Sequence, residues 1–161
     1  TDNNIYFLLK GAARGYTKYG DKQIVDLFYT DNNFMANIDS VFLEFPSRLT
    51  VECITPCIIF SFSKKILFEK LNSVPSLQFK IYEILVSYIR THEERVMLLT
   101  KYPIAALSYL KFKEIYGDYV NVFSNKDVAS YLGITAEALT RIKKGLSLSV
   151  ENRGEDVSHC I

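Results

Sequence analysis

The spacing of apolar residues changes near residue 63, and this change limits the folds that the chain can adopt. Before that point, short apolar segments are separated by polar or glycine-containing turns, such as residues 19–22, a pattern typical of short antiparallel strands. After it, apolar residues recur every three or four positions, which is the period of a helix. The two halves therefore predict an α+β chain in which an antiparallel β domain precedes a set of helices.

The expected elements end where glycine, proline or a capping residue interrupts each pattern. Strands are predicted over residues 5–10, 12–19, 24–29, 48–54 and 58–62, with a polar turn at 30–33. Helices are predicted over residues 64–71, 75–100, 104–116 and, as a pair, 125–144. Ser63 can cap the first helix, and Pro75 suits the first turn of the second. Pro103 ends the long helix, and Gly117 ends the next one.

Composition excludes several classes of protein. The 161 residues are 48% hydrophobic and 23% charged, so the chain has enough apolar material for a packed core. No window approaches 18 consecutive apolar residues, and the first residues lack a secretory signal, so we expect no membrane span. Three cysteines indicate a reducing cytoplasm, and two histidines are too few for a His-rich metal site. Cys53 and Cys57 are expected to be small apolar side chains rather than a metal or redox pair.

The long helix predicted over 75–100 carries two apolar stripes side by side. The first contains Tyr82, Leu85, Ile89, His92, Val96 and Leu99, and the second contains Leu77, Ile81, Ile84, Tyr88 and Leu98. One stripe is enough to pack on the β domain, so the other predicts contact with the same helix of a partner chain. The expected homodimer interface includes Leu85, Ile89, His92 and Val96. The alternative is a helix buried on two sides within one monomer.

Residues 125–144 have the pattern of two short helices joined by a tight turn. Apolar residues at helical spacing, interrupted once by residues 133–135, are Val128, Leu132, Leu139 and Ile142. Gly133 supplies the positive φ that ends the first helix, and Thr135 can cap the second. The outer face of that second helix carries Glu137, Thr140, Arg141 and Lys144. This arrangement predicts a helix-turn-helix whose second helix enters a DNA major groove. The alternative is an ordinary helical hairpin with a solvated face.

Residues 131–144 resemble the DNA-binding helices of the Crp/Fnr transcription regulators, and the rest of the chain agrees in order. Residues 6–11 are similar to the strand and glycine at the centre of that family's cyclic-nucleotide-binding β-roll, and residues 31–38 and 46–48 resemble its phosphate-binding cassette. The long helix lies where the family has its dimerisation helix. The resemblance covers about residues 4–146. It implies a jelly-roll-type antiparallel β-roll followed by a dimerisation helix and an all-α helix-turn-helix domain.

The resemblance also implies a division of the chain by role. An effector-sensing β-roll covers residues 1–72, the dimerisation helix 73–101, the DNA-binding domain 102–148, and a disordered tail 149–161. Because the family's β-roll has about eight strands, we expect this β-roll to be incomplete at its N-terminus.

The function that the resemblance implies is that of a cytoplasmic, homodimeric regulator without catalytic activity. Such a protein binds a palindromic site on double-stranded DNA and contacts RNA polymerase. One alternative is a sensor or scaffold module of the same fold that does not bind DNA. Another is a cupin-like metal enzyme, which would need a His/Glu cluster that the two histidines, both outside the β half, cannot supply.

The resemblance assigns roles to the outer face of the helix-turn-helix. In the family, a Glu and an Arg four residues apart read base edges, and they match Glu137 and Arg141 here. Arginine fits guanine O6 and N7, and a carboxylate accepts from cytosine N4. Thr140 is expected to contact a base as well, and Ala136 favours a TTGA-type half-site. Expected phosphate contacts are Ser124, Lys126, Thr135, Lys143 and Lys144. Residues 124–148 carry four cations against two acids, a net charge of +2, which suits DNA.

The expected effector pocket departs from that of family members that bind cyclic AMP. Those members have a Gly-Glu pair and an Arg followed by a hydroxyl residue, whereas this chain has Ala36-Asn37 and Arg48-Leu49. Asn37 lacks the charge of a carboxylate, and Leu49 offers no hydrogen bond to a phosphate. We therefore expect no cyclic AMP response and no other cofactor. A different anionic or apolar effector, or a constitutively positioned dimer, remains.

Overall fold

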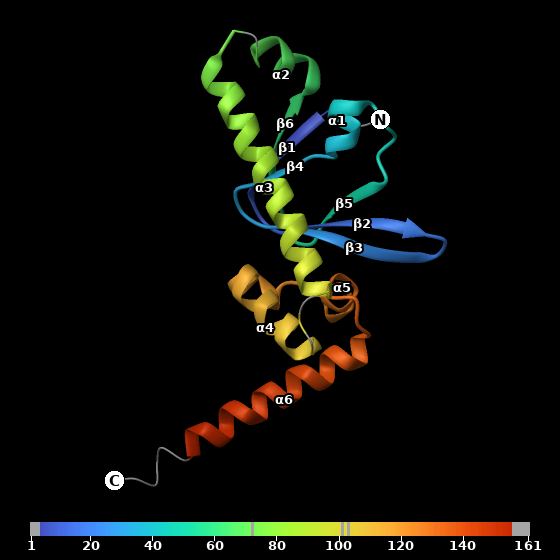
Figure 1. The fold of residues 1–161 in the computed structure, drawn as a ribbon, viewed down its shortest axis with the longest axis vertical. Coiled ribbons are helices and arrows are strands. Elements are labelled where there is room, and N and C mark those ends of the chain that lie inside the picture. The colour runs from blue at the N-terminus through green and yellow to red at the C-terminus, as the bar shows by residue number, and fades with distance from the viewer. Residues whose placement is uncertain (1–3, 72, 101, 103, 156–161) are drawn as a thin grey trace. The chain divides into compact units, whose positions relative to one another are not determined.

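The computed structural model describes residues 4–71, 73–100, 102 and 104–155, and it confirms the α+β class (Figure 1). The chain divides into two compact units, Thr1–Val96 and Met97–Ile161, each with its own buried residues. Within the described residues, none of the helices combines the length and the apolar character that a membrane span needs.

The strands of the first unit form two antiparallel sheets of three strands each. In the first sheet, β1 (Asn4–Lys10) lies between β4 (Asn33–Met35) and β6 (Ile58–Ser63). In the second sheet, β2 (Ala13–Tyr19) lies between β3 (Lys22–Tyr29) and β5 (Leu49–Cys53). Tyr19 pairs with Lys22 across the β2–β3 hairpin, and Gly20 takes the positive φ of 57° that so short a turn requires. The five strands expected from the sequence are therefore confirmed.

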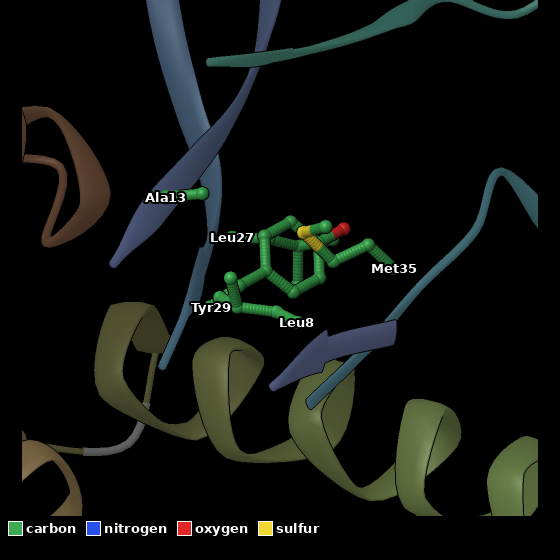
Figure 2. Close-up of a cluster of buried hydrophobic side chains, with 5 residues drawn as sticks. All are labelled: Leu8, Ala13, Leu27, Tyr29 and Met35. Atoms are coloured by element: carbon green, nitrogen blue, oxygen red, sulfur yellow. The ribbon is translucent and has the colours of Figure 1, made fainter. Parts of the chain in front are cut away.

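The core of the first unit joins the two sheets. Leu8 and Met35 come from the first sheet, and Ala13, Leu27 and Tyr29 come from the second (Figure 2). All five side chains are buried in one cluster, because alternate residues of each strand face the opposite sheet. Partly buried residues packed against it are Tyr6, Leu49, Cys57 and Tyr88.

Two elements of the first unit were not predicted from the sequence. β4 (Asn33–Met35) follows the polar turn, and α1 (Ile38–Leu43) comes soon after it. Asn37 caps α1, since its Oδ1 accepts a hydrogen bond from the Ser40 backbone N–H at 3.0 Å. Both elements are too short to show a period in the sequence, so only the pairing with β1 and the cap define them.

The next two helices begin and end where the sequence predicts. α2 spans Lys64–Leu71 and α3 spans Pro75–Thr100. Ser63 is confirmed as the cap of α2, because its Oγ accepts a hydrogen bond from the Ile66 N–H at 3.2 Å. Arg95 holds α3 on β3: its guanidinium lies 3.1 Å from the Asp26 carboxylate and donates to the Val25 carbonyl at 3.1 Å.

The second unit is helical. After the end of α3 it contains α4 (Ala105–Tyr116), a 3-10 helix (Gly117–Asn121), α5 (Asn125–Tyr131) and α6 (Ala136–Glu155). Its core is aromatic, with the buried rings of Phe112 and Tyr131 5.6 Å apart between centroids. Ser108 Oγ donates to the Leu98 carbonyl at 2.9 Å and ties the last turn of α3 to α4. This contact explains why the second unit begins inside α3.

Helix α6 is longer than the sequence predicts. It runs to Glu155, although residues 149–161 were expected to be a disordered tail. Elongation of a helix needs no tertiary contact, because each added residue gains a backbone hydrogen bond. A segment without an apolar period can therefore continue a helix. Residues 156–161, with His159 and Cys160, and the expected helix breaker Pro103 lie outside the described part of the chain.

Candidate nucleic-acid interface and effector cavity

The first helix of the candidate DNA-binding motif is fixed by its own cap. Ser124 Oγ accepts a hydrogen bond from the Asp127 backbone N–H at 3.1 Å and donates to the Asp127 carboxylate at 2.7 Å. This reciprocal cap begins α5, and Val128 and Ala129 on its inner face are buried. The Ser124 hydroxyl, which was expected at a DNA phosphate, is therefore used within the protein.

The turn between α5 and α6 has the geometry that the sequence predicts. Gly133 has a φ of 67°, and its N–H donates to the Ser130 carbonyl at 3.2 Å. Thr135 Oγ1 accepts a hydrogen bond from the Ala138 N–H at 3.1 Å and so caps α6. A Cβ atom at Gly133 would lie 3.0 Å from Leu99 Cδ2. Both the backbone conformation and the available space therefore favour glycine in this turn.

Helix α6 separates apolar from polar residues as predicted. Leu139 is completely buried, whereas the exposed residues of the outer face are Glu137, Thr140, Arg141 and Lys144. These four occupy positions i, i+3, i+4 and i+7 and so share one face of the helix. An exposed face with a carboxylate, a hydroxyl and two cations carries the groups that pair with base edges and phosphates.

Glu137 is held as a carboxylate before any ligand binds. Its pKa is lowered, first by a hydrogen bond from its own backbone N–H, then by the Thr135 hydroxyl, and further by the charge of Arg141. Thr140 is also oriented, because its Oγ1 donates to the backbone carbonyl one turn earlier at 2.9 Å. The Thr135 hydroxyl, expected at a phosphate, is thus engaged inside the motif, while the three expected base-reading side chains stay exposed.

The lysines expected to contact phosphates fall into two groups. Lys126 and Lys144 are exposed. Lys143 is half-buried, and its Nζ donates to Asn125 Oδ1 and lies 5.5 Å from the centroid of the Tyr109 ring. Lys143 therefore links α6 to α5 and α4, a structural role that its position in the sequence did not indicate.

A further basic residue, Lys113 of α4, lies near this surface. Burial, and then the charge of Lys113, lower the pKa of Lys143, which places the two ammonium groups close together. Lys113 is exposed. Sequence patterns could not identify it, because it lies on a different helix and only the packing of α4 against α6 brings it here.

The exposed apolar stripe of α3 differs from the stripe predicted for the dimer interface. Large apolar side chains that are more than half exposed follow a seven-residue repeat and are Phe79, Tyr82, Val86, Ile89 and Val96. Glu93 occupies the remaining position of that repeat. Of the four predicted interface residues, Ile89 and Val96 lie on this stripe, whereas Leu85 and His92 are half-buried beside it.

His92 packs within its own protomer. Its ring centroid lies 4.4 Å from that of Tyr88, which contacts the core. Burial, and then the charge of Arg95, lower the pKa of His92. Its Nε2 is buried without a hydrogen-bond partner among the described residues. We had expected a hydrogen-bonded interface histidine, and residue spacing could not distinguish the stripe that the β domain covers from the one that it leaves exposed.

A cavity of about 270 Å³ lies where the effector pocket is expected. Its wall includes Ala36, Asn37 and Leu49, together with apolar side chains such as Val51. Arg48, the cation expected to face a phosphate, is exposed and does not belong to the wall. Among the described residues, the wall therefore contains no positive charge.

Asn37, which stands where cyclic-AMP-binding members have Glu, is used for structure. Its Oδ1 caps α1, and its Nδ2 donates to Ser47 Oγ at 2.8 Å. Ser47 Oγ in turn donates to the Leu49 carbonyl at 2.9 Å. Because both ends of the Asn37 amide have partners, a ligand in the cavity would meet a mainly apolar surface.

Comparison with solved structures identifies proteins of the same fold, although no protein-family model and no curated protein matches the sequence. FixK2 from Bradyrhizobium japonicum is 19% identical, with a TM-score of 0.73 over 91% of this chain and 76% of that chain. TTHB099, a transcriptional regulator of the CRP family from Thermus thermophilus, is 12% identical, with a TM-score of 0.73 over 91% and 76%. A cyclic nucleotide-binding domain containing protein from Listeria monocytogenes is 14% identical, with a TM-score of 0.71 over 91% and 73%.

Proposed function

The chain has the fold of the Crp/Fnr regulators, and on this premise we propose that it is a sequence-specific DNA-binding transcription regulator. The observation that carries the proposal is the outer face of α6. Glu137, Thr140 and Arg141 are exposed there, while Leu139 on the opposite face is buried in the motif. A solvated hairpin would not need the capped turn and positive-φ glycine that hold this face in place.

The exposed residues of α6 divide the work of binding DNA. Arg141 donates two hydrogen bonds to a guanine, and Glu137, already held by Thr135, accepts from a cytosine amino group. Thr140 contacts the neighbouring base, in a half-site that resembles TTGA. Lys126 and Lys144 contact phosphates and contribute affinity without reading sequence.

We propose a parallel homodimer along the exposed stripe of α3. The helix has 26 residues and is therefore about 39 Å long, enough for several heptads of contact. Burial of Phe79, Val86 and Ile89 against the partner removes apolar surface that a monomer leaves in water. A two-fold pair places two α6 helices about one DNA turn (~34 Å) apart, which matches a palindromic site. The bound dimer then contacts RNA polymerase.

The cavity of the β domain takes an uncharged, largely apolar effector. Arg48 is absent from its wall and both ends of the Asn37 amide are occupied, so a cyclic phosphate has no charged partner there. Titration calorimetry with cyclic AMP is expected to show no binding in the micromolar range. Micromolar binding that Arg48→Ala abolishes would contradict this part of the proposal.

DNA selection followed by titration tests the proposed function. The full chain is used to select duplexes from a random pool, and binding of the selected site is measured by fluorescence anisotropy. Arg141→Ala should cost about 1–3 kcal/mol and relax the preference at one guanine of each half-site, whereas Lys144→Ala should weaken all sequences equally. Failure to select any sequence, or equal sequence-independent losses for both variants, would show that α6 does not read bases.

A further inference from the structure

Two cysteines lie at the two ends of one short loop in the β domain. Cys53 is the last residue of β5, and Cys57 comes directly before β6. The loop between them is held against the β1–β2 turn, because the Ile54 and Thr55 N–H groups donate to the Ala12 carbonyl at 2.8 and 3.2 Å. The Thr55 hydroxyl accepts from the Ala12 N–H at 2.9 Å. These bonds fix the separation of the two cysteines.

The two thiols are in contact. The side chains of Cys53 and Cys57 are hydrogen bonded to each other, and the Cys57 thiol lies 3.2 Å from the Thr55 carbonyl. Gly11 provides the space for this arrangement, because a Cβ atom at Gly11 would fall 2.7 Å from Cys57 Sγ. The sulfur atoms are thus already adjacent in the folded chain, and bonding them closes only a short loop.

The surroundings of the pair favour thiol chemistry over a purely structural role. Cys53 is exposed and forms part of the wall of the 270 Å³ cavity, so small oxidants reach it. Cys57 is half-buried against the core cluster. Among the described residues, no third His, Cys, Asp or Glu joins them in a group that could hold a metal ion. The sequence analysis expected two small apolar side chains, but an exposed Cys53 does not fit that role.

We propose that Cys53 and Cys57 are a dithiol that is reversibly oxidised by hydroperoxides to an intramolecular disulfide at the wall of the cavity. The Cys53 thiolate attacks one oxygen of the hydroperoxide, the O–O bond breaks, and Cys53 becomes a sulfenic acid while water or an alcohol leaves. Cys57 then attacks the Cys53 sulfur, the S–S bond forms, the S–O bond breaks, and water leaves. Two thiols and one hydroperoxide thus yield one disulfide, and an external thiol restores both cysteines.

The disulfide would connect the two sheets at one place. β5 is an outer strand of the second sheet and β6 is an outer strand of the first. Oxidation therefore cross-links the edges of the sheets and changes the wall that an effector meets. Partial burial, and then the hydrogen bond to Cys57, raise the pKa of Cys53, so oxidation should become faster as the pH rises. The inference does not depend on DNA binding.

Alkylation and mass spectrometry test the proposal on the full chain carrying Cys160→Ser, which removes the remaining cysteine. The protein is treated with hydrogen peroxide, unfolded, and alkylated with iodoacetamide. We expect the reduced protein to take two alkyl groups and the oxidised protein to take none, with the loss of two hydrogen atoms and full recovery in dithiothreitol. Native protein should form the disulfide roughly tenfold faster than the same protein in denaturant, because the fold holds the thiols together.

Cys57→Ser on the same background is the matched control. It should accumulate the sulfenic acid or mixed products at Cys53 and never the species that lacks two hydrogen atoms. The proposal is wrong if Cys57 remains fully alkylated after Cys53 is oxidised, or if disulfides form only between chains. It is equally wrong if the native protein reacts no faster than the unfolded one.

Discussion

Replacing Gly133 with alanine tests whether backbone conformation holds the turn of the DNA-binding motif. Gly133 has a φ of 67°, and a left-handed conformation costs a residue with a Cβ atom about 1–2 kcal/mol. The new Cβ would also lie 3.0 Å from Leu99 Cδ2. That atom is the end of a flexible side chain, so the contact adds little. We expect the free energy of unfolding of the second unit to fall by about 1–2 kcal/mol.

Two matched substitutions separate conformational strain from lost space. Gly145→Ala lies inside α6 with open space around it, so it should stabilise the unit by about 0.5–1 kcal/mol. Gly133→Asn introduces a larger side chain than alanine but tolerates positive φ better. If φ dominates, the expected order of stability is Gly145→Ala, wild type, Gly133→Asn, and Gly133→Ala last.

Urea unfolding followed by circular dichroism measures this order. Protein concentration must be the same throughout, because a dimer links stability to concentration. DNA affinity measured in parallel should fall for Gly133→Ala and remain for Gly145→Ala, since only the first disturbs the position of α6. A Gly133→Ala variant that unfolds at the wild-type urea concentration, or an asparagine variant less stable than the alanine one, would refute the reasoning.

Three further predictions concern the α3 stripe, the β core and the outer face of α6. Ile89→Asp should dissociate the homodimer and Glu93→Ile should strengthen it, because both positions lie on the exposed heptad repeat; sedimentation that changes with neither would argue against this seam. Leu8→Ala should lower the free energy of unfolding of the first unit by about 2–5 kcal/mol, because Leu8 is completely buried, whereas Leu9→Ala, at 40% exposure, should cost much less. Equal losses in urea unfolding would contradict the described core. Because the pKa of Glu137 is lowered in the folded state, its stabilisation is present above the ordinary pKa of the residue and is lost as the pH falls through the folded-state pKa. Glu137→Gln should therefore destabilise the protein at neutral pH but not at about pH 2, and a difference that persists in acid would exclude this cause.

Features that depend on neighbouring residues could be predicted from the sequence. Ser63 and Thr135 cap helices because a hydroxyl at the first turn reaches an N–H three residues later. Gly133 ends α5 because positive φ costs glycine almost nothing. The exposed face of α6 follows from the helical period alone, so its three expected base-reading residues are where the pattern placed them.

The uses of individual polar groups were predictable only in part. Ser124 and Thr135 were expected at phosphates, but their hydroxyls bond Asp127 and Glu137 inside the motif. Asn37 was expected to face a ligand, but it caps α1 and bonds Ser47. In each case the residue type showed that a hydrogen bond forms, and only the structure showed to which atom.

The sequence by itself determined the order of the elements, their ends, and the period of each helix, because these depend on contacts within a few residues. The tertiary structure decided which apolar surfaces are covered. On α3, Tyr88 and His92 pack against one another beside the β core, and this leaves Ile89 and Val96 on the exposed stripe. Likewise, β4 exists because residues 33–35 pair with β1, which lies far earlier in the chain. Residue spacing is a local property, whereas burial depends on residues that are distant in sequence and meet only in the folded protein.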